Sequence, residues 1–415
     1  MISCEGKENP IAGSGLRRLS CGLTASFASS RAIEDGATVK SGAIRVGVIG
    51  AGSFGLFALQ HFTQIPGVQL AGMAGTHREA AFAMAQRFGL ADVEEVDALL
   101  ARPDIDLVYI ATPPFLHYPQ GLKALQAGKH VICEKPLAMD LQQADEMIKV
   151  AQQKRLVLIA NLMQRYNPVF EQIRQLIESK LLGEFLHGYF KNYASDEGLT
   201  PNHWFWDRSK SGGIFIEHGV HFFDLFSGWL GPGQVVAGQR TLRPGTHLEE
   251  QVNCTARYQD GALVNFYHGF TQPMQMDRQE FRLLFERGDV KLEEWVPIRA
   301  RIHALADEKQ TRELMALFQG QLDVTSLFGG KQRAAWGRHK PLDIYQRIEI
   351  SYGLDCEKMH RYGKLLRAMF RDQLSWIYNP KHHRKLTEEN GRDSLRMALQ
   401  ATRLADQDAS EARGA

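Results

Sequence analysis

The segment between Gly212 and Asp224 carries side chains suited to acid–base or metal chemistry, among them Glu217, His218 and His221. An apolar run begins within it, so we expect a helix with Glu217 and His221 on one face and Asp224 one turn beyond. Taking a hydride from an alcohol leaves a proton, and imidazole, with an ordinary pKa of about 6.5, suits its removal. The segment therefore predicts His221 as a general base, with a carboxylate nearby to set its tautomer.

Two alternatives remain for the same segment. Glu217, His218, His221 and Asp224 are all metal-ligand types, but the two histidines lack the His-Glu-x-x-His pattern of zinc enzymes. Proton transfer is therefore favoured, and no metal is expected. The second alternative is a buried, hydrogen-bonded histidine without a catalytic role.

Two loops expected at the carboxyl edge of a parallel sheet carry further polar groups. Thr112, Pro113 and Pro114 follow one buried run, with His117 shortly after, and Glu134-Lys135-Pro136 follows the next run. Open α/β sheets bind ligands at this edge, where the prolines would form a rigid wall. A lysine there can hold a substrate oxygen and move a proton if burial lowers its pKa, whereas an isolated lysine is commonly a surface charge.

The run Gly50-Ala-Gly52-Ser53-Phe54-Gly55 directly follows a short apolar strand and precedes a helical pattern. The first glycine permits a tight turn, the second lets the backbone approach a pyrophosphate, and the third allows close packing of helix and strand. The helix N-terminus would offer free N–H groups to the phosphates. This context favours a dinucleotide site over an ordinary glycine-rich turn.

The end of the second strand bears on which dinucleotide binds. NAD-binding proteins usually place Asp or Glu there against the ribose hydroxyls, but Gly75-Thr76-His77-Arg78 has no carboxylate. Thr76 can donate a hydrogen bond to a 2′-phosphate, and Arg78 can pair with it bidentately. The segment favours NADP over NAD, with a solvated Arg78 in the next helix as the alternative.

The elements that must position these groups change character near residue 162. Before it, strand-like runs alternate with helical patterns, which predicts a doubly wound parallel sheet over 43–162 in an α/β protein. After it, 163–407 read as an α+β domain with an open, mostly antiparallel sheet, and a final helix over 394–405 is expected to pack back on the first domain. The segments expected to be extended are 185–193, 235–242, 252–258, 262–270, 280–285 and 290–295.

The two ends of the chain are expected to lie outside these domains. Residues 1–42 are rich in Ser, Gly and Ala and lack periodicity, so we expect a disordered leader, and 408–415 are expected to form a tail. Arg17 and Arg18 precede a weakly apolar stretch, so a twin-arginine export signal is the alternative, although Gly, Ser and Thr interrupt that stretch.

Composition excludes several classes of protein. A net charge of +2 over 415 residues is too balanced for binding nucleic acid through a whole-surface field. No apolar run approaches the roughly 18 residues of a membrane helix. The five cysteines show no Cys-x-x-Cys spacing, which favours a reduced, cytoplasmic setting.

Together, these motifs resemble the glucose–fructose oxidoreductase / inositol dehydrogenase / MocA (Gfo/Idh/MocA) family. Their joint order along the chain is more specific than any one of them, and the resemblance covers about residues 43–407. The segments that carry it are 44–55, 110–117, 127–136, 204–207, 212–224 and 386–391.

The resemblance implies a Rossmann domain followed by an α/β domain whose open sheet commonly forms a homo-oligomer interface. It also implies that Lys135 is the catalytic lysine and His221 the catalytic histidine, with Glu217, which stands where many members have Asp, as a catalytic residue that supports His221. The residues expected to bind the dinucleotide are Gly50, Gly52, Ser53, Phe54, Gly55, Thr76, Arg78, Thr112, Pro113, His117, Glu134 and Lys135. Those expected to line the substrate site are Asn161, Arg165, Trp204 and His221.

The expected function is hydride transfer between NADP, or NAD, and a sugar, cyclitol or related polyol. One alternative on the same scaffold is redox-neutral glycoside cleavage or elimination with tightly held NAD(H). Another is a non-catalytic regulator that senses a dinucleotide, which would need neither Lys135 nor His221. No nucleic-acid or membrane partner is expected.

Overall fold

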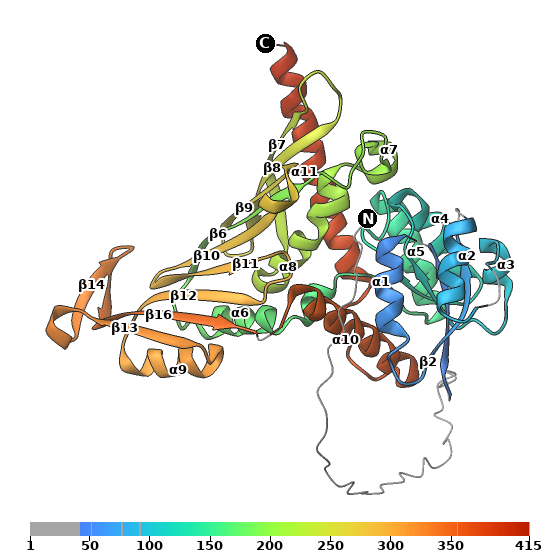
Figure 1. Cartoon of the computed structure of the whole chain (residues 1–415). Helices are drawn as coiled ribbons and strands as arrows, with labels where there is room; N and C mark the ends of the chain where they lie inside the picture. Colours follow the sequence, from blue (N-terminus) through green and yellow to red (C-terminus); the bar gives the residue numbers. More distant parts are fainter. Residues whose placement is uncertain (1–41, 51, 76–77, 91–92, 355, 415) are drawn as a thin grey trace, which may run out of the picture. The chain divides into compact units, whose positions relative to one another are not determined.

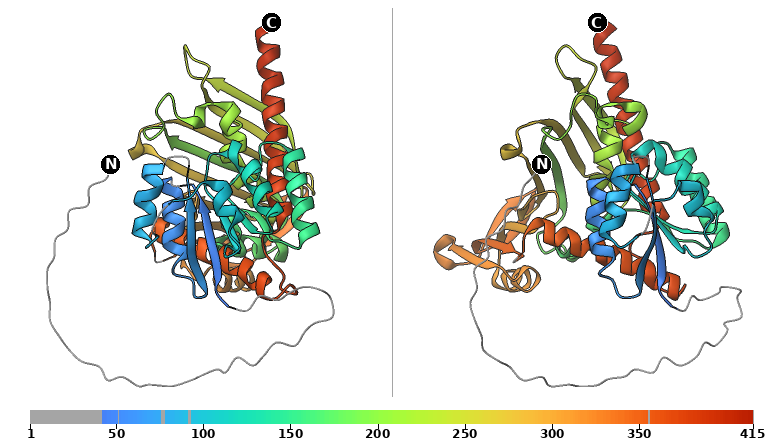
Figure 2. Two further views of the ribbon diagram at one scale, coloured as in Figure 1. Left: turned by 90° about the vertical axis from the view of Figure 1, so that its right-hand side faces the viewer. Right: turned by 45° about the vertical axis from the view of Figure 1, so that its right-hand side comes forward.

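A five-stranded parallel sheet forms the first part of the fold in the computed structural model, which describes residues 42–50, 52–75, 78–90, 93–354 and 356–414. The strand order is β2-β1-β3-β4-β5, and helices lie on both faces (Figures 1 and 2). The strands are nearly continuous apolar runs because both faces are covered. This confirms the predicted doubly wound sheet. Its strands are β1 (Ile44–Ile49), β2 (Val68–Ala74), β3 (Leu107–Ile110), β4 (His130–Cys133) and β5 (Leu158–Ala160).

The helices of this part alternate with the strands. Asp140 begins α5 by accepting a hydrogen bond from the Gln143 N–H at 2.8 Å, which satisfies one of the free donors at the helix start. The short helix α3 was not predicted. The helices are α1 (Ser53–Phe62), α2 (Arg78–Arg87), α3 (Val96–Ala101), η1 (Pro114–Leu116), α4 (His117–Gln126) and α5 (Leu141–Lys154).

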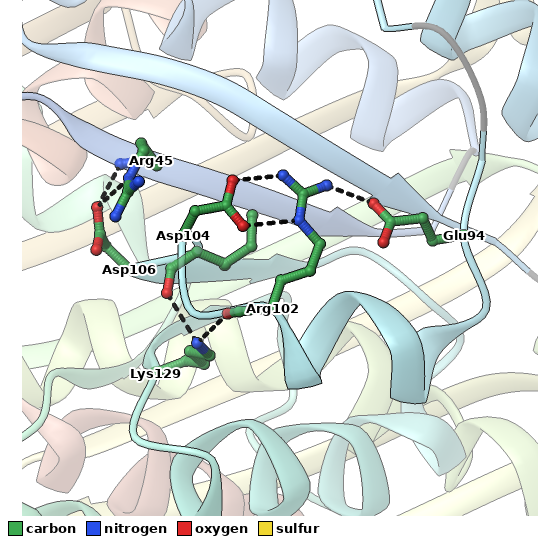
Figure 3. Close-up of polar contacts among 7 residues, drawn as sticks. Arg45, Glu94, Arg102, Asp104, Asp106 and Lys129 are labelled. Atoms are coloured by element: carbon green, nitrogen blue, oxygen red, sulfur yellow. Dashed lines mark hydrogen bonds and ion pairs between the residues drawn. The ribbon is translucent and has the colours of Figure 1, made fainter.

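A cluster of charged residues flanks the strands of this sheet, with Arg45, Asp106 and Lys129 near their amino ends and Glu94 beside the last residue of β2 (Figure 3). Arg102 lies at its centre, 2.6 Å from Glu94 and 2.6 Å from Asp104. The guanidinium lowers the pKa of the Asp104 carboxyl to about 2 by hydrogen bonding and charge. Because these charged groups pair with one another and with backbone carbonyls, we interpret the cluster as structural. Its members are Arg45, Glu94, Arg102, Asp104, Asp106 and Lys129.

A nine-stranded mixed sheet forms the second part, in the order β13-β16-β12-β11-β10-β6-β9-β8-β7. Only β6 and β9 pair in parallel within it, so the predicted mostly antiparallel sheet is confirmed. Alternate residues of β10 are buried because one face of the sheet is covered by helix α8 (Val220–Leu230). The strands are β6 (Phe185–Ser195), β7 (Gly233–Leu242), β8 (Glu249–Tyr258), β9 (Leu263–Gln272), β10 (Arg278–Phe285), β11 (Gly288–Glu293), β12 (Arg299–Ala306), β13 (Gln321–Ser326) and β16 (Gln346–Gly353).

Shorter elements connect and extend this sheet. The region 304–350, unassigned from sequence, contains helix α9 and a separate two-stranded hairpin, β14–β15, which projects beyond the main sheet (Figure 1). These elements are η2 (Met163–Tyr166), α6 (Pro168–Ser179), η3 (Trp204–Trp206), α7 (Arg208–Ser211), η4 (Phe215–Gly219), η5 (Met274–Met276), α9 (Glu308–Phe318), η6 (Phe328–Gly330), β14 (Arg333–Gly337) and β15 (Lys340–Ile344).

Two long helices close the chain, and both differ from the sequence prediction. Helix α10 (Lys358–Tyr378) was not predicted, although its apolar residues have helical spacing, and it packs on α1 through Tyr362 and Phe370. Helix α11 (Glu388–Gly414) extends the predicted 394–405 helix at both ends, so 408–414 are helical rather than a tail. Gly391 lies inside this helix and does not end it. A Cβ at this position would come within 3.1 Å of Ala160, so the glycine allows α11 to pack closely against the end of β5.

Helix α11 contacts both parts of the fold. In the first part it contacts β5 and α5, and in the second part it contacts β7 and α8. Its Arg392 forms an ion pair with Asp145 of α5. No helix in the described parts of the chain is long and apolar enough to cross a membrane. The predicted leader, with Arg17 and Arg18, lies outside the described residues.

Candidate active site

An ion pair between Lys135 and Glu217 joins the two parts of the fold. Lys135 follows β4 and precedes Pro136 across a cis peptide bond. Its Nζ donates to the Glu217 carboxylate and, at 2.5 Å, to the Glu217 backbone carbonyl. The two side chains are only 15% and 13% exposed, so little water screens the pair. The ammonium is therefore fixed at the carboxyl edge of the parallel sheet.

A π-helical turn, η4, presents Glu217 to Lys135. The prediction of one regular α-helix through Glu217 and His221 is wrong, because the five residues of η4 precede α8. Gly212 and Gly213 adopt φ values of 82° and 93°, which favour glycine, and lead the chain into this turn. The Ile214 N–H donates to the buried Glu249 carboxylate at 2.7 Å, which anchors its start.

His221 is only 8% exposed and is the second residue of α8, near the ion pair. Burial, together with the positive charge of Lys135, holds the pKa of His221 well below its usual range. Its Nδ1 is buried and finds no hydrogen-bond partner among the described residues. The imidazole is therefore neutral at pH 7 and able to accept a proton, as a general base requires.

Asp224 does not orient His221, which corrects the sequence prediction. Its carboxylate accepts hydrogen bonds from Arg165 Nε and Nη2, each at 2.8 Å, and its backbone carbonyl accepts a third. Asp224 is 2% exposed, so this bidentate pair ties η2 to α8 inside the protein. The same geometry corrects the expectation for Arg165, whose guanidinium is committed to Asp224 rather than free for a substrate.

Glu134 and Asn161 bind each other, although one was expected to contact the dinucleotide and the other the substrate. The Glu134 carboxylate accepts hydrogen bonds from Asn161 Nδ2 at 2.8 Å and from the Tyr109 hydroxyl. Burial raises the pKa of Glu134. These three residues form a buried polar cluster at the ends of β3, β4 and β5, and Glu134 directly precedes Lys135 in the sequence. Their main role in this geometry is to support the Lys135 loop.

His117 links the two loops of the carboxyl edge. It is fully buried, and its ring nitrogens lie 2.7 Å from the backbone carbonyls of Thr112 and Pro136. The Thr112 hydroxyl donates to Gln120 at 2.7 Å. His117 is thus a bridge between loops, which corrects its expected contact with the dinucleotide, while Pro113 remains half-buried at this edge.

The glycine loop fits a dinucleotide. A Cβ at Gly50 would lie 2.4 Å from the Ala111 carbonyl, and one at Gly55 would lie 3.2 Å from the Gly50 carbonyl, so both positions need glycine for packing. Gly52 is exposed with nothing within 4 Å of the Cβ position, and no side chain caps α1. Ser53 and Phe54 are the first residues of α1. Because no side chain caps this helix N-terminus, its backbone N–H groups are available to bind a pyrophosphate.

The remaining predicted contacts are only partly described. Thr76 lies outside the described residues, and the Arg78 side chain is not described, although Arg78 begins α2. Trp204 is half-buried in η3, next to His203 at a ring distance of 5.1 Å. The following helix α7 contacts η1, so this segment lies near the Pro113 loop.

No group of three or more His, Cys, Asp or Glu side chains suited to a metal occurs within the described part of the chain.

Three more residues near the site, His218, His268 and Trp295, are not among the catalytic or binding residues expected from the sequence. His218 lies beside Glu217, with its ring 5.3 Å from that of His268 on β9, and burial and the charge of Lys135 lower the pKa of His218 to about 3. Trp295 follows β11, and its ring centre is 6.3 Å from that of His221. The motif around Glu217 signals His218, but no local pattern signals His268 or Trp295, because only the sheet pairing brings them to the site.

Comparisons with known proteins bear on the family and the fold of the chain. Residues 44–162 match the model of an oxidoreductase family with an NAD-binding Rossmann fold, and 170–291 match the Gfo/Idh/MocA C-terminal domain. A 1,5-anhydro-D-fructose reductase from Ensifer adhaerens is 31% identical over 55% of this chain and 69% of its own length. A UDP-N-acetylglucosamine 3-dehydrogenase from Acidithiobacillus ferrooxidans is 38% identical over 44% of this chain and 53% of its own length.

The alignments with these relatives span about half to two thirds of their length. Among solved structures, the WlbA dehydrogenase from Bordetella pertussis in complex with NADH and UDP-GlcNAcA superposes with a TM-score of 0.70. That match covers 89% of this chain and 97% of the other at 18% identity, so it establishes a common fold.

Proposed function

Because this chain belongs to the Gfo/Idh/MocA oxidoreductase family, we propose that it transfers a hydride between a nicotinamide dinucleotide and a sugar, cyclitol or related polyol. The observation that carries the proposal is the Lys135–Glu217 ion pair beside the neutral His221. These groups come from two separate parts of the fold and converge where the Lys135 loop meets η4. A structural ion pair alone would not require a proton acceptor beside it.

The dinucleotide would be held by Gly50, Gly52 and the N-terminus of α1, and its nicotinamide supplies the hydride acceptor or donor. In the oxidative direction, Lys135 Nζ donates a hydrogen bond to the reacting hydroxyl oxygen. A ring nitrogen of His221 takes the proton of this hydroxyl, while a hydride passes from the carbon that bears the hydroxyl to the nicotinamide. The alcohol thereby becomes a carbonyl. In the reductive direction, His221 returns that proton. Glu217 keeps the ammonium of Lys135 in place and partly offsets its charge.

NADP is the dinucleotide that we propose within this class. Support comes from the segment after β2, which lacks the carboxylate that would meet a ribose hydroxyl and carries Thr76 and Arg78 instead. Family relatives bind either form: one solved neighbour holds NADH and another, a biliverdin reductase from Synechocystis, holds NADP+. If Arg78 contacts a 2′-phosphate, Arg78→Ala should weaken NADPH binding and leave NADH binding unchanged.

We also propose that copies of the chain associate through the face of the nine-stranded sheet opposite α8. Paired aromatic and cationic side chains lie there: the Tyr193 and Tyr267 rings are 5.5 Å apart, and Arg278 lies over Tyr193. Such groups are enriched in protein interfaces. Light scattering should give a mass that is a multiple of the chain mass, and a monomer at all concentrations would count against this.

The experiment that tests the proposed function begins with calorimetric titration of NADH and NADPH into the purified protein. The dinucleotide-bound protein is then assayed with cyclic and open-chain polyols for formation or loss of reduced nicotinamide. Binding with net hydride transfer supports the proposal. Binding with product formation but no net reduction supports the redox-neutral alternative, and binding without turnover supports the regulator. Absence of binding would remove the proposal altogether.

A further inference from the structure

Trp295 brings an aromatic surface into the candidate active site. It lies in the connection between β11 and β12, and its half-buried ring centre is 6.3 Å from that of His221. On its other contact, the ring meets Tyr362 of α10 edge-on at 4.8 Å. Tyr362 in turn contacts Phe54 of the glycine loop at 5.6 Å. Trp295 is thus the member of this aromatic series that contacts the proposed general base.

The backbone of Trp295 is held at both of its polar groups. Its N–H donates to Gln279 Oε1 at 3.2 Å, and its carbonyl accepts a hydrogen bond from Gln164 Nε2. Both glutamines are buried, at 6% and 1% exposure, so these contacts are shielded from competing water. The backbone that carries the indole ring is therefore held in place by two buried hydrogen bonds.

Glu294, which precedes Trp295, also holds this part of the backbone in place. Glu294 has a φ of 74°, in the left-handed region that residues other than glycine rarely adopt. Its N–H donates to the Gln279 carbonyl at 2.9 Å, and its carboxylate accepts from Lys358 of α10 at 2.5 Å. Unfavourable backbone conformations persist where surrounding contacts over-determine them, and they cluster at functional sites. These four hydrogen bonds hold the backbone of Trp295 and of its neighbour Glu294 beside His221.

We propose that Trp295 is a stacking platform that selects substrates in closed-ring form, and this inference rests on the proposed hydride-transfer function. The C–H bonds on one face of a pyranose or cyclitol ring carry partial positive charge, which the negative face of an indole attracts. A ring presents several such bonds together. An open-chain polyol would have to freeze several torsions to present the same surface, which costs conformational entropy.

The charges around the site indicate a neutral ring at the reacting end of the substrate. Lys135 is paired with Glu217, and Arg165 is paired with Asp224. Neither cation is left unbalanced to receive a carboxylate on the substrate ring. The recognised group is therefore a neutral, hydroxylated ring that stacks on Trp295 and places one hydroxyl between Lys135 and His221.

The test compares binding of two probes, myo-inositol and D-glucitol, to the protein saturated with dinucleotide. The probes carry the same number of hydroxyl groups, but only the first is a ring. Saturation-transfer NMR gives both affinities for the unchanged protein and for Trp295→Ala, Trp295→Phe and Trp336→Ala. Trp336 is 75% exposed on the remote hairpin β14–β15, so its variant is the matched control.

The unchanged protein should bind the ring about tenfold more tightly than the open chain. Trp295→Ala should lose that preference, Trp295→Phe should retain part of it, and Trp336→Ala should retain all of it. Equal affinities, no detectable binding of myo-inositol, or a preference that survives Trp295→Ala would overturn the proposal. So would a selective loss of dinucleotide affinity in Trp295→Ala, because the ring would then serve the dinucleotide.

Thermal unfolding of each variant separates misfolding from a local effect, and Trp295→Phe keeps the test meaningful if Trp295→Ala unfolds. Dinucleotide titration is measured separately on the same samples. Failure of that titration removes the proposed function, whereas intact dinucleotide binding without ring preference removes only the role of Trp295.

Discussion

At the scale of single residues, the site combines a charged pair with a neutral base. Lys135 is held by both the carboxylate and the carbonyl of Glu217, and His221 is kept neutral by burial. The motifs predicted Lys135, Glu217 and His221, because each lies in a short segment with a recognisable residue pattern. The motifs could not predict that Asp224 forms an ion pair with Arg165, because the two residues are 59 positions apart in the sequence.

Glu217→Gln tests the charged pair. The amide can still accept a hydrogen bond from Lys135, but the ammonium loses the negative charge that balances it beside His221. Turnover should fall by about 10- to 100-fold with dinucleotide affinity unchanged. Glu217→Asp keeps the charge and should lose less, and Glu313→Gln, on an exposed helix, serves as the control. Unchanged turnover in Glu217→Gln would mean that the pair is only structural.

His268→Phe tests how burial of neutral histidines links stability to pH. Burial holds the pKa of His268 well below its usual range, and neither ring nitrogen has a partner among the described residues. Below pH of about 6.5 the unfolded chain protonates this histidine while the folded protein does not, so stability falls as pH falls. This histidine contributes up to about 1.4 kcal/mol per pH unit to that slope.

Phenylalanine fits the aromatic surroundings of His268, which include Phe190 and Phe222. Urea unfolding at several pH values should therefore show a shallower acid slope in His268→Phe than in the unchanged protein. Trp336→Phe, on the remote hairpin β14–β15, changes no titratable group, so it is the control and should leave the slope as it was. Equal slopes for all three proteins would contradict the account of His268.

At the scale of elements, the parallel strands and the glycine loop followed from local patterns. The π-turn η4 did not, because nothing in the residue spacing distinguishes it from the start of α8. The apolar residues of α10 have helical spacing, whereas Gly391 resembles a helix boundary although it lies inside α11. Local patterns therefore fixed most elements, while close packing decided the boundaries.

The glycine loop allows fold and binding to be separated by two substitutions. Gly52→Ala has room in the protein and an ordinary backbone conformation, so the melting temperature should stay nearly constant. Its methyl group would occupy the approach of the pyrophosphate, and dinucleotide affinity should fall about tenfold or more. Gly50→Ala should instead destabilise the protein, because its Cβ would lie 2.4 Å from the Ala111 carbonyl.

Thermal unfolding and calorimetric titration with NADH and NADPH check both variants. Equal affinities for the unchanged protein and Gly52→Ala would show that the pyrophosphate does not approach the loop at this position.

At the scale of the whole molecule, the candidate site forms where the Lys135 loop of the first part of the fold meets η4 of the second part. Lys135 and Glu217 are 82 residues apart, and Gln164 and Trp295 are 131 residues apart. Such contacts depend on sheet order and on helices such as α8 and α10, which single motifs do not encode. This is why local motifs could point to Lys135, Glu217 and His221 but not to Trp295, which lies beside His221.

The most direct test of the central claim compares hydride transfer in the unchanged protein with that in Lys135→Met and His221→Asn. Reduced nicotinamide is followed by absorbance with an accepted polyol, and dinucleotide affinity is measured on the same samples. Both variants should bind dinucleotide as before and lose at least about 100-fold in turnover, because each removes a group that handles the reacting hydroxyl. Full turnover in both variants would contradict the assignment of this site.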